Sequence, residues 1–508
     1  MKDWQAFCLL AVILVIGLAL IMQLFSGPDI VYDDGGYIQF VHQIFQGDFI
    51  PQTYIESYSL GFIYVLSLFF GTFGFNLTAS VLPGITEYLL LVVATFVTGR
   101  KLGGNSVAVL AAMFAATSPT VVGYATRILP DTLLGLCVAL AVLVLLYAID
   151  TKKDYLFLVS GLITGFAVSV RLDGFLFVFF YTLALFAALW LRKDDEHKRM
   201  FAYFAVGVVI ALAGFFYAFW AYTGNPISGV VQFQKILPNA LSTLPNNIGM
   251  ALALISPVPP ANFQYVRPVE QYSLGPVILL SLTGSAISLY KKDKFWVLAT
   301  ISLGVFLYYV FGTYSLFAYS PIVLVDRFFA MILMPISILA AYTVLAVYES
   351  LKKKSRAYAA IAVLVLVSSS LFYSVPAYSV LYQLNNQIKG QWVVYDSAVS
   401  YLATALRGEN VSLYMWGDNV DLQATLIRFF ITKNQSIDAL PLYSIPCNPP
   451  KNAFILMTAQ PNIFVIVNKS LSSMIYRAEE NCSVSVSQIE VFNSSGVTGT
   501  LYRITGGQ

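Results

Sequence analysis

Two adjacent carboxylates, Asp33 and Asp34, follow an intensely apolar N-terminal segment in the stretch IVYDDGGYIQF, residues 30–40. Only 11% of the chain is charged, so two neighbouring acids at the end of an apolar segment require a chemical or structural reason. A carboxylate beside a hydroxyl group can take its proton while the oxygen attacks another molecule. The pair is therefore a candidate general base.

Arginines and further acids occur at similar positions, in loops or at the ends of apolar segments. They include Arg127, Asp131, Arg171, Arg267, Glu270 and Arg327. Guanidinium groups bind phosphate through charge-assisted, often bidentate hydrogen bonds, and they can stabilise a phosphate as it departs. Together these residue types predict chemistry on a phosphate-linked substrate.

The composition is that of a membrane protein. Of the 508 residues 58% are hydrophobic, and the mean hydropathy of +0.74 is too high for a soluble fold. The first apolar run is long for a signal peptide and lacks a small-residue cleavage motif, so we expect it to remain as a span. About eleven transmembrane helices are predicted, near residues 7–25, 79–98, 105–123, 132–149, 155–170, 174–191, 200–220, 273–290, 295–312, 328–348 and 357–375.

Basic residues predict which side of the membrane each loop occupies. Up to residue 375, the loops expected in the cytoplasm hold sixteen Lys and Arg residues, and the opposite loops and helix ends hold five. Such a bias predicts a cytoplasmic N-terminus, and the odd number of spans then predicts a C-terminus outside the plasma membrane. The apolar segment 60–75 is expected to lie along the outer interface, because a crossing there would reverse this orientation. The small net charge of +3, gathered in short clusters, argues against nucleic acid as a partner.

Two domains are expected. Residues 1–375 form the membrane domain, with long outer loops at 27–78 and 221–272. Beyond residue 375 the hydropathy falls, and the runs VSLYMW (411–416) and NIFVIV (462–467) predict strands among helical patterns. We therefore expect residues 376–508 to form an extracytoplasmic α/β domain.

Glycan acceptor motifs agree with that location. Five of the eleven Asn residues in this domain begin an N-x-[ST] triplet, against about one or two expected from ordinary composition. Such enrichment is typical of an exported, glycosylated surface. The predicted acceptors are Asn410, Asn434, Asn468, Asn481 and Asn493, with Asn76 in the first outer loop as a sixth.

The four cysteines divide between the two domains. Cys8 and Cys137 lie in predicted spans, where we expect them to act as small packing residues. Cys447 and Cys482 are the pair in the outer domain, and a disulfide between them is favoured over two free thiols. A bridge of this loop length stabilises a domain by about 3–4 kcal/mol.

The distribution of charges separates two classes of membrane protein. A secondary transporter usually binds its substrate near the membrane midplane, whereas an enzyme that uses a lipid-linked substrate needs its reactive groups at one surface. Outside the cytoplasmic clusters, the ionisable residues of the membrane domain all fall in outer loops or at outer helix ends. This pattern favours the enzyme.

The order of several motifs resembles a known superfamily. An N-terminal span is followed by DDGGY (33–37), GRKLGG (99–104) and SPTVVGYATRILPDTLL (118–134), and later by GLITGFAVSVRLDG (161–174) and VDRFFAMILMPISILAAY (325–342). This arrangement is similar to the C-type glycosyltransferases of the protein O-mannosyltransferase and lipid A aminoarabinose transferase kind. The resemblance covers most of residues 1–375 and implies a polytopic helical fold with its catalytic acid in the first outer loop.

The resemblance also implies roles for individual residues. Asp33 matches the first acid of the family's D-[DE] motif and is the expected base, with Asp34 at the second acidic position, where the family more often has Glu. Asp131 matches the acid of the second outer loop, and Arg327 matches a phosphate-binding position. Some relatives use a divalent cation and others do not, so Mg²⁺ or Mn²⁺ held by the three acids stays an open alternative.

Structural interpretations of the same residues remain open beside these roles. Asp131 could cap the helix that follows Pro130, and Arg127 could pair with Asp131 instead of binding phosphate. Arg327 could pair with Asp326, and Arg171 with Asp173, within their own loops. Arg267 and Glu270 could be solvated loop charges, and the Tyr37 ring is a candidate to stack on a sugar.

The sequence therefore predicts a membrane glycosyltransferase. Its donor would be a sugar on a polyprenyl phosphate, and its acceptor a hydroxyl of a protein, glycan or lipid at the outer face. Direct displacement, with an Asp as base, would invert the anomeric configuration. The alternative is a non-enzymatic lipid-carrier transporter or surface-assembly protein. An oligosaccharyltransferase acting on Asn is disfavoured, because no WWD-like motif occurs and the nearest match is WGD at 416–418.

Overall fold

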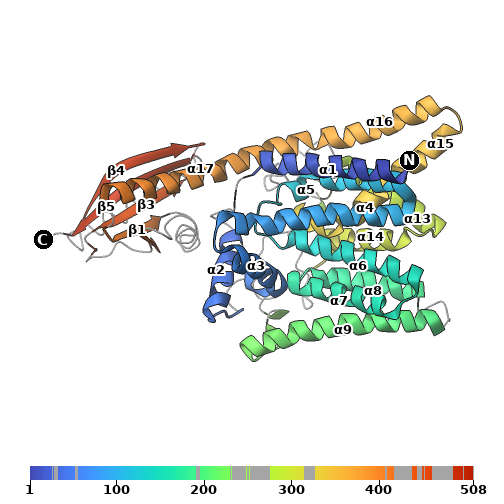
Figure 1. Ribbon diagram of the computed structural model, residues 1–508, viewed down its shortest axis with the longest axis horizontal. Coiled ribbons are helices and arrows are strands. Elements are labelled where there is room, and N and C mark those ends of the chain that lie inside the picture. Colours follow the sequence, from blue (N-terminus) through green and yellow to red (C-terminus); the bar gives the residue numbers. More distant parts are fainter. Residues whose placement is uncertain are drawn as a thin grey trace.

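The computed structural model describes most of the chain as a helical bundle with a small sheet beyond one end (Figure 1). The residues that it describes are 1–25, 27, 33–51, 55–189, 195–228, 230–231, 247–248, 251, 275–313, 326–406, 409–416, 437–442, 449–450, 452–459, 484–495 and 497–506. The predicted fold class, a polytopic helical membrane protein with a C-terminal α/β part, is confirmed.

The predicted spans all fall on helices. The helices are α1 (Asp3–Gln23), α2 (Asp33–Gln46), α3 (Leu60–Phe73), α4 (Leu77–Ala116), α5 (Pro119–Val122), α6 (Asp131–Thr151), α7 (Asp154–Val170), α8 (Gly174–Leu189), α9 (Asp195–Thr223), α13 (Gly275–Lys291), α14 (Trp296–Phe311), α15 (Leu333–Lys352), α16 (Arg356–Tyr373) and α17 (Val375–Leu406), with 3₁₀ turns η1 (Ile55–Tyr58) and η4 (Asp326–Ile332). By length and composition, six described segments could cross a membrane, namely Asp3–Gln23, Leu77–Ala116, Asp131–Thr151, Asp195–Thr223, Arg327–Lys352 and Arg356–Leu406. Shorter apolar helices lie beside them, so this is a multi-pass membrane protein, and the number eleven stays a prediction.

Helix α4 contains two of the predicted spans. Its backbone reverses at Gly104, whose φ of 79° is a conformation that glycine adopts without strain. The two halves then lie side by side, because the Tyr88 hydroxyl donates to the carbonyl oxygen of Ala116 at 2.8 Å. Gly99 allows the close approach, since a Cβ at that position would lie 3.2 Å from the Cα of Ala108. The motif GRKLGG is thus the turn of a helical hairpin.

Segments that the sequence predicts on the cytoplasmic side meet at one end of the bundle. Arg100 pairs with Asp3 at 2.9 Å, and Lys152 pairs with Glu196 at 3.2 Å. These exposed pairs contribute little stability, but they join the N-terminus and three separate loops. The opposite end carries α2, α3 and α5 and faces the sheet (Figure 1). The grouping of the loops therefore agrees with the predicted topology, whereas the orientation in the cell stays a prediction.

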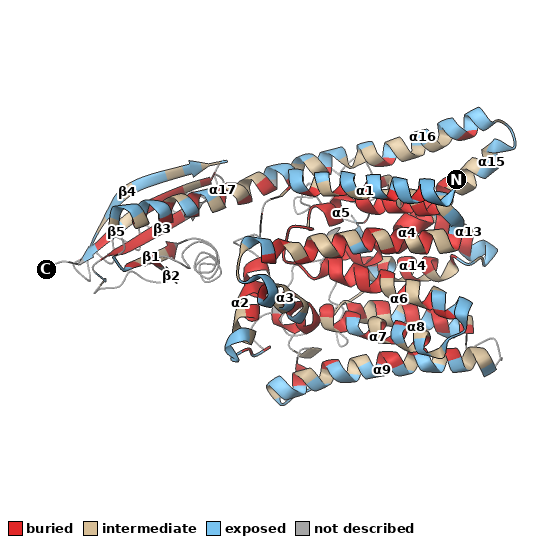
Figure 2. Cartoon of the chain, in the orientation of Figure 1, coloured by how far each residue is buried: buried red, intermediate tan, exposed pale blue. Residues whose placement is uncertain are grey.

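Burial separates central from peripheral helices (Figure 2). Helix α15 is buried on most sides, and α4 and α6 pack against it. By contrast, α1 and α16 expose large apolar side chains such as Val15, Leu364 and Phe372. Exposed apolar helix faces are stable where lipid surrounds them, because the helix satisfies its own backbone polar groups.

The C-terminal part forms a five-stranded mixed sheet. Its strands are β1 (Val411–Trp416), β2 (Ile437–Pro441), β3 (Ala453–Ala459), β4 (Val484–Ser494) and β5 (Val497–Gly506). Their order is β2-β1-β3-β5-β4, with β1 parallel to both neighbours and β5 antiparallel to both of its neighbours. The predicted strand VSLYMW is β1, whereas NIFVIV (462–467) lies outside the described residues.

Helix α17 connects the bundle to the sheet. The predicted domain boundary after residue 375 falls where α16 ends and α17 begins. The helix runs outward beside α1 and continues along β4 and β5 (Figure 1). Residues 376–406, the first part of the predicted outer domain, therefore belong to a helix that both parts share.

The modification sites are described only in part. Cys8 is exposed and Cys137 is buried, both as free thiols. Asn410 and Asn493 are exposed. Asn76, in contrast, is the N-cap of α4: its Oδ1 accepts from the Ala79 amide at 2.9 Å and its Nδ2 donates to the Phe73 carbonyl. The predicted sites Asn434, Asn468, Asn481, Cys447 and Cys482 lie outside the described residues.

We expect a glycan on Asn410 and Asn493 but not on Asn76 when the chain is made in a cell that glycosylates exported sequons. The Nδ2 of Asn76 is engaged at a helix cap whose loss costs about 1 kcal/mol. Peptide mass spectrometry after enzymatic deglycosylation in water labelled with oxygen-18 measures the occupancy of each site. A glycan on Asn76 would contradict this expectation, and unmodified Asn410 and Asn493 would contradict the predicted outer location.

Candidate active site

Asp33, the first acid of the tandem pair, forms an ion pair with an arginine that lies near the end of the membrane part in sequence. Asp33 begins α2, and its Oδ2 accepts from Nη1 of Arg327, in η4, at 2.8 Å. The two side chains are 30% and 26% exposed. The pair joins segments 294 residues apart in sequence and stays accessible to a ligand.

The second acid is buried and tied to the second outer loop. Asp34 has no exposed surface, and its Oδ2 accepts from Nε of Arg127 at 2.9 Å. Its other oxygen, Oδ1, accepts from the backbone amide of Ile128 at 3.1 Å. Both oxygens of this carboxylate therefore connect α2 to the segment that leads into α6.

A third ion pair joins α6 to the turn between α7 and α8. Arg171 donates to Asp131, and its Nε forms an ion pair with Oδ2 of Asp173 at 2.7 Å. Its guanidinium also lies over the ring of Phe328, 4.2 Å from the ring centre. Burial disfavours the charge, but the carboxylates of Asp131 and Asp173 outweigh this effect and raise the pKa of Arg171 above its ordinary value. Arg171 therefore stays a cation.

The exposed pair and the third pair belong to one charged cluster, which we name the outer cluster: Asp33, Asp131, Arg171, Asp173 and Arg327. Arg327 interacts electrostatically with Asp131 as well as with Asp33. Two buried atoms of the outer cluster, Oδ2 of Asp131 and Nε of Arg327, have no hydrogen-bond partner among the described residues. One acceptor and one donor of the outer cluster thus lack a partner within the described part of the chain.

Close helix contacts determine where these charges lie. A Cβ at Gly84 of α4 would lie 2.5 Å from the carbonyl oxygen of Ala125, so only glycine allows the segment that carries Arg127 to approach. Gly135 of α6 makes a similar contact with the Ala330 carbonyl of η4, three residues after Arg327. Each contacted carbonyl lies within three residues of an arginine, Arg127 or Arg327. A side chain at either glycine would therefore displace the segment that carries that arginine.

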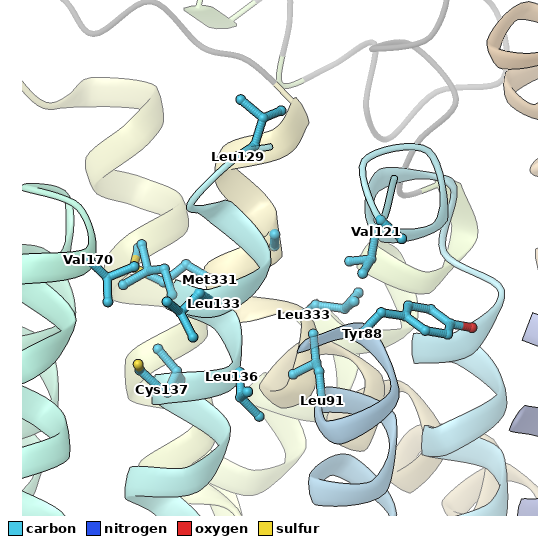
Figure 3. Close-up of a cluster of buried hydrophobic side chains, with 14 of the residues drawn as sticks. Tyr88, Leu91, Val121, Leu129, Leu133, Leu136, Cys137, Val170, Met331 and Leu333 are labelled. Atoms are coloured by element: carbon cyan, nitrogen blue, oxygen red, sulfur yellow. The ribbon is translucent and has the colours of Figure 1, made fainter. Parts of the chain in front are cut away.

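A layer of buried apolar side chains, shown in Figure 3, includes residues that are close in sequence to the outer cluster. Leu133, Val170 and Met331 group together in that layer, and each follows or precedes a charged residue by four positions or fewer. All three are buried. Apolar surroundings lower the local dielectric constant, and they therefore strengthen electrostatic interactions between the charges that lie beside them.

The structure brings together most of the predicted site residues. Asp33, Asp34, Arg127, Asp131, Arg171 and Arg327 form the three ion pairs. Asp131 lies in the first turn of α6 and Pro130 is the N-cap, so the capping interpretation of Asp131 is wrong. Arg267 and Glu270 lie outside the described residues, as does the side chain of Asp326.

Tyr37 lies near the outer cluster but is buried. Its ring is 4% exposed and packs edge to face against Phe62, with 4.9 Å between ring centres. Its hydroxyl donates to Oγ of Ser59 at 3.5 Å. A sugar could stack on this ring only after the contact with Phe62 opens.

Two aromatic residues of the site escaped the sequence analysis. Phe328, next to Arg327 in sequence, supplies the ring under Arg171, and Tyr309 of α14 packs against Phe328 at 5.5 Å. The sequence did contain a signal for Phe328, because this aromatic residue lies beside a predicted phosphate-binding arginine. Tyr309 gives no such signal, because it lies among other apolar residues of its span.

The described residues contain no group of three His, Cys, Asp or Glu side chains placed to hold a metal ion. The acids proposed as ligands, Asp33, Asp34 and Asp131, are each paired with an arginine, whose charge would repel a cation. The Mg²⁺ or Mn²⁺ alternative stays a prediction, and no step proposed below passes through a metal ion.

Comparison with known proteins places this architecture. Residues 58–220, less than half of the chain, match the family described as dolichyl-phosphate-mannose-protein mannosyltransferase. Among proteins with curated functions, none matches the sequence. ArnT from Cupriavidus metallidurans bound to undecaprenyl phosphate superposes with a TM-score of 0.61 at 12% identity, and the match covers 97% of each chain. An oligosaccharyltransferase from Archaeoglobus fulgidus, AglB, in complex with an inhibitory peptide and a dolichol-phosphate, matches with a TM-score of 0.51 at 11% identity, over 100% of this chain and 75% of that one.

The chain has the fold of the C-type glycosyltransferases. In this C-type fold the match to ArnT covers the C-terminal part as well as the membrane part, since it includes 97% of the chain. The resemblance seen in the motifs is thereby confirmed at the level of fold. Asp33 begins α2, which lies at the end of the bundle that faces the sheet (Figure 1), so the outer cluster lies at that end.

Replacing Asp34 with Asn should lower the stability of the protein by about 3 kcal/mol, because it leaves the buried Arg127 without its charge partner. Thermal unfolding in detergent measures the change. Glu87→Gln is the matched control. Glu87, which lies in α4, is buried as Asp34 is, but its carboxylate oxygens have no hydrogen-bond partner among the described residues. We expect that variant to be as stable as the wild type or more so. Equal effects of the two substitutions would show that the ion pair of Asp34 carries no special stability.

Proposed function

We propose that this protein is a glycosyltransferase that moves a sugar from a polyprenyl-phosphate carrier to the hydroxyl group of a protein, glycan or lipid acceptor. The observation that carries the proposal is the half-exposed pair of Asp33 and Arg327, which joins a proton acceptor to a phosphate-binding group. The C-type fold supports it, since a structure with this fold, ArnT, is bound to undecaprenyl phosphate.

Arg327 is the proposed ligand of the carrier phosphate. Its Nε is buried without a partner among the described residues, and its Nη1 is held by one carboxylate at 2.8 Å. A phosphate that binds Nε and Nη2, which lie on the same edge of the guanidinium, would form a bidentate contact. Asp33 would keep its contact with Nη1 on another edge. One arginine would thus hold the carrier phosphate and the base side by side.

Asp33 is the proposed general base, and Asp34 is the positioning residue beside it. Both oxygens of Asp34 are occupied in the interior, whereas Asp33 is partly exposed. The acceptor hydroxyl oxygen attacks the anomeric carbon and forms the new glycosidic bond as the bond from that carbon to the phosphate oxygen breaks. The hydroxyl proton passes to Asp33, and the polyprenyl phosphate leaves with the bonding electrons. A single displacement of this kind inverts the anomeric centre.

Asp131 and Arg171 complete the proposed site. Arg171 is held between two carboxylates and above Phe328, which fixes the direction of its guanidinium. Oδ2 of Asp131, which has no hydrogen-bond partner among the described residues, can accept from a hydroxyl of the donor sugar or the acceptor. Neither residue needs to exchange a proton in the reaction.

The site is proposed to face the outside of the plasma membrane, with the N-terminus in the cytoplasm. The charge bias of the loops supports this orientation. The sheet lies beyond the same end of the bundle as the outer cluster (Figure 1), so the C-terminal part would also be extracytoplasmic. Acceptors would then be exported molecules, and the lipid part of the donor would lie in the surrounding bilayer.

Asp33→Asn should lower the rate of sugar transfer by about 10²–10⁴-fold without loss of folding, because the amide cannot take the acceptor proton. The measurement is transfer of radiolabelled sugar from a polyprenyl-phosphate donor by purified protein, with Glu87→Gln as the control that should retain activity. A half-exposed position makes Asp33→Asn far less damaging to stability than Asp34→Asn. Transfer at the wild-type rate by Asp33→Asn would remove Asp33 as the base. A wild-type protein that binds the donor and transfers nothing would favour a carrier-lipid transporter or an assembly protein.

Arg327→Gln should weaken the use of the donor. Loss of a hydrogen bond to a charged group costs about 1.5–3 kcal/mol, which corresponds to about 10- to 150-fold in kcat/KM for the polyprenyl-phosphate sugar. Initial rates at varied donor concentration measure this ratio, and varied acceptor concentration provides the comparison. An effect confined to the acceptor KM would show that Arg327 does not bind the carrier phosphate.

A further inference from the structure

One face of helix α17 lies against the outer ends of other helices. Its residues Tyr378, Asn385 and Trp392 are spaced by seven positions, which puts them on the same side of the helix. Leu381 and Ile388 occupy the intervening turns of that side, and each is 2% exposed. We name this side of α17 the strut face.

The strut face contacts the connection that leads to the second outer loop. The hydroxyl of Tyr378 donates to the carbonyl oxygen of Thr117 at 2.8 Å. Thr117 is the C-cap of α4, where carbonyl groups lack partners within the helix. Leu381 packs over Gly123, since a Cβ there would lie 2.8 Å from its methyl groups. These two contacts lie just before Arg127 in the chain.

The same face contacts the start of the first outer loop. The amide of Asn385 donates to the carbonyl oxygen of Leu24, the C-cap of α1. Trp392 lies beside Gly27, where a Cβ would be 3.5 Å from its indole nitrogen. Gly27 has a φ of 79° and precedes Asp33 by six residues. One helix thus supplies hydrogen-bond donors to the ends of α1 and α4, from which the two charged loops begin.

The other half of α17 belongs to the sheet. Gly390 contacts the backbone of Ser494, and Val394 packs on Gly499. Tyr401 packs edge to face against Phe492, with 6.2 Å between ring centres. Since α17 is one continuous helix, a displacement of the sheet would be transmitted to Tyr378 and Asn385.

We propose that the strut face is a positioning element of the active site: it holds the loop that carries Asp33 and the loop that carries Arg127 and Asp131 in register. The proposal rests on the proposed function in taking the outer cluster as the reactive site. Reaction requires the base and the phosphate ligand to lie within a fraction of an ångström of their productive places, and small displacements lower rates strongly. The ion pair of Asp34 and Arg127 links the two loops from within, and α17 links them from outside.

The test compares the same chemical change at two tyrosines of α17, one that contacts the end of α4 and one that is exposed. Tyr378→Phe removes the hydroxyl that binds Thr117, and Tyr382→Phe makes the identical change one turn further on, at a side chain that is 46% exposed. We expect Tyr378→Phe to lower kcat by about three- to tenfold with the donor KM unchanged, the range that loss of one hydrogen bond implies. Tyr382→Phe should retain the wild-type kcat, and both variants should melt at similar temperatures.

A second measurement does not depend on turnover. Hydrogen–deuterium exchange of the peptides that cover residues 24–40 and 117–131 should become faster in Tyr378→Phe and in Asn385→Leu, but not in Tyr382→Phe. Unchanged exchange and unchanged kcat in both strut-face variants would overturn the positioning role. A raised KM with unchanged kcat would also overturn the positioning role, because that result would assign the residues to substrate binding. Failure of the wild type to transfer sugar would refute the proposed function, while the exchange result would still decide whether α17 orders the loops.

Discussion

The burial of charge beside apolar helices is the constraint on which the rest of this structure depends. A charged side chain is stable in such surroundings only when an opposite charge and hydrogen bonds replace water. Asp34 and Asp131 are almost fully buried, and each meets an arginine from a different segment. The need to pair these acids therefore draws the first outer loop, the second outer loop and the turn after α7 together.

The tandem acids show how the same constraint separates two roles. Successive residues of a helix point about 100° apart, so Asp33 and Asp34 at the start of α2 cannot face the same surroundings. One side chain enters the interior, where its two oxygens bind Arg127 and the amide of Ile128. The other stays half exposed beside Arg327. The buried acid orders the loop, and the loop then presents the exposed acid.

Helix α17 adds a link between the membrane part and the sheet. Its first half donates hydrogen bonds to the terminal carbonyl groups of α1 and α4, and its second half packs on β4 and β5. The C-terminal part is thus connected to the charged loops by a continuous element. In a glycosyltransferase with this arrangement, an acceptor that engaged the sheet could influence the geometry around Asp33.

The sequence by itself determined the membrane class, the positions of the helices, the grouping of the loops and the identity of the charged residues, because hydropathy and charge act locally along the chain. It also indicated β1 and the hairpin turn at GRKLGG. Only the tertiary structure decided which acid pairs with which arginine, that Asp34 is buried while Asp33 is not, and that α17 is shared by both parts. Those features depend on contacts between segments up to 361 residues apart, and on glycines such as Gly84 and Gly135 whose meaning appears only when another backbone lies against them.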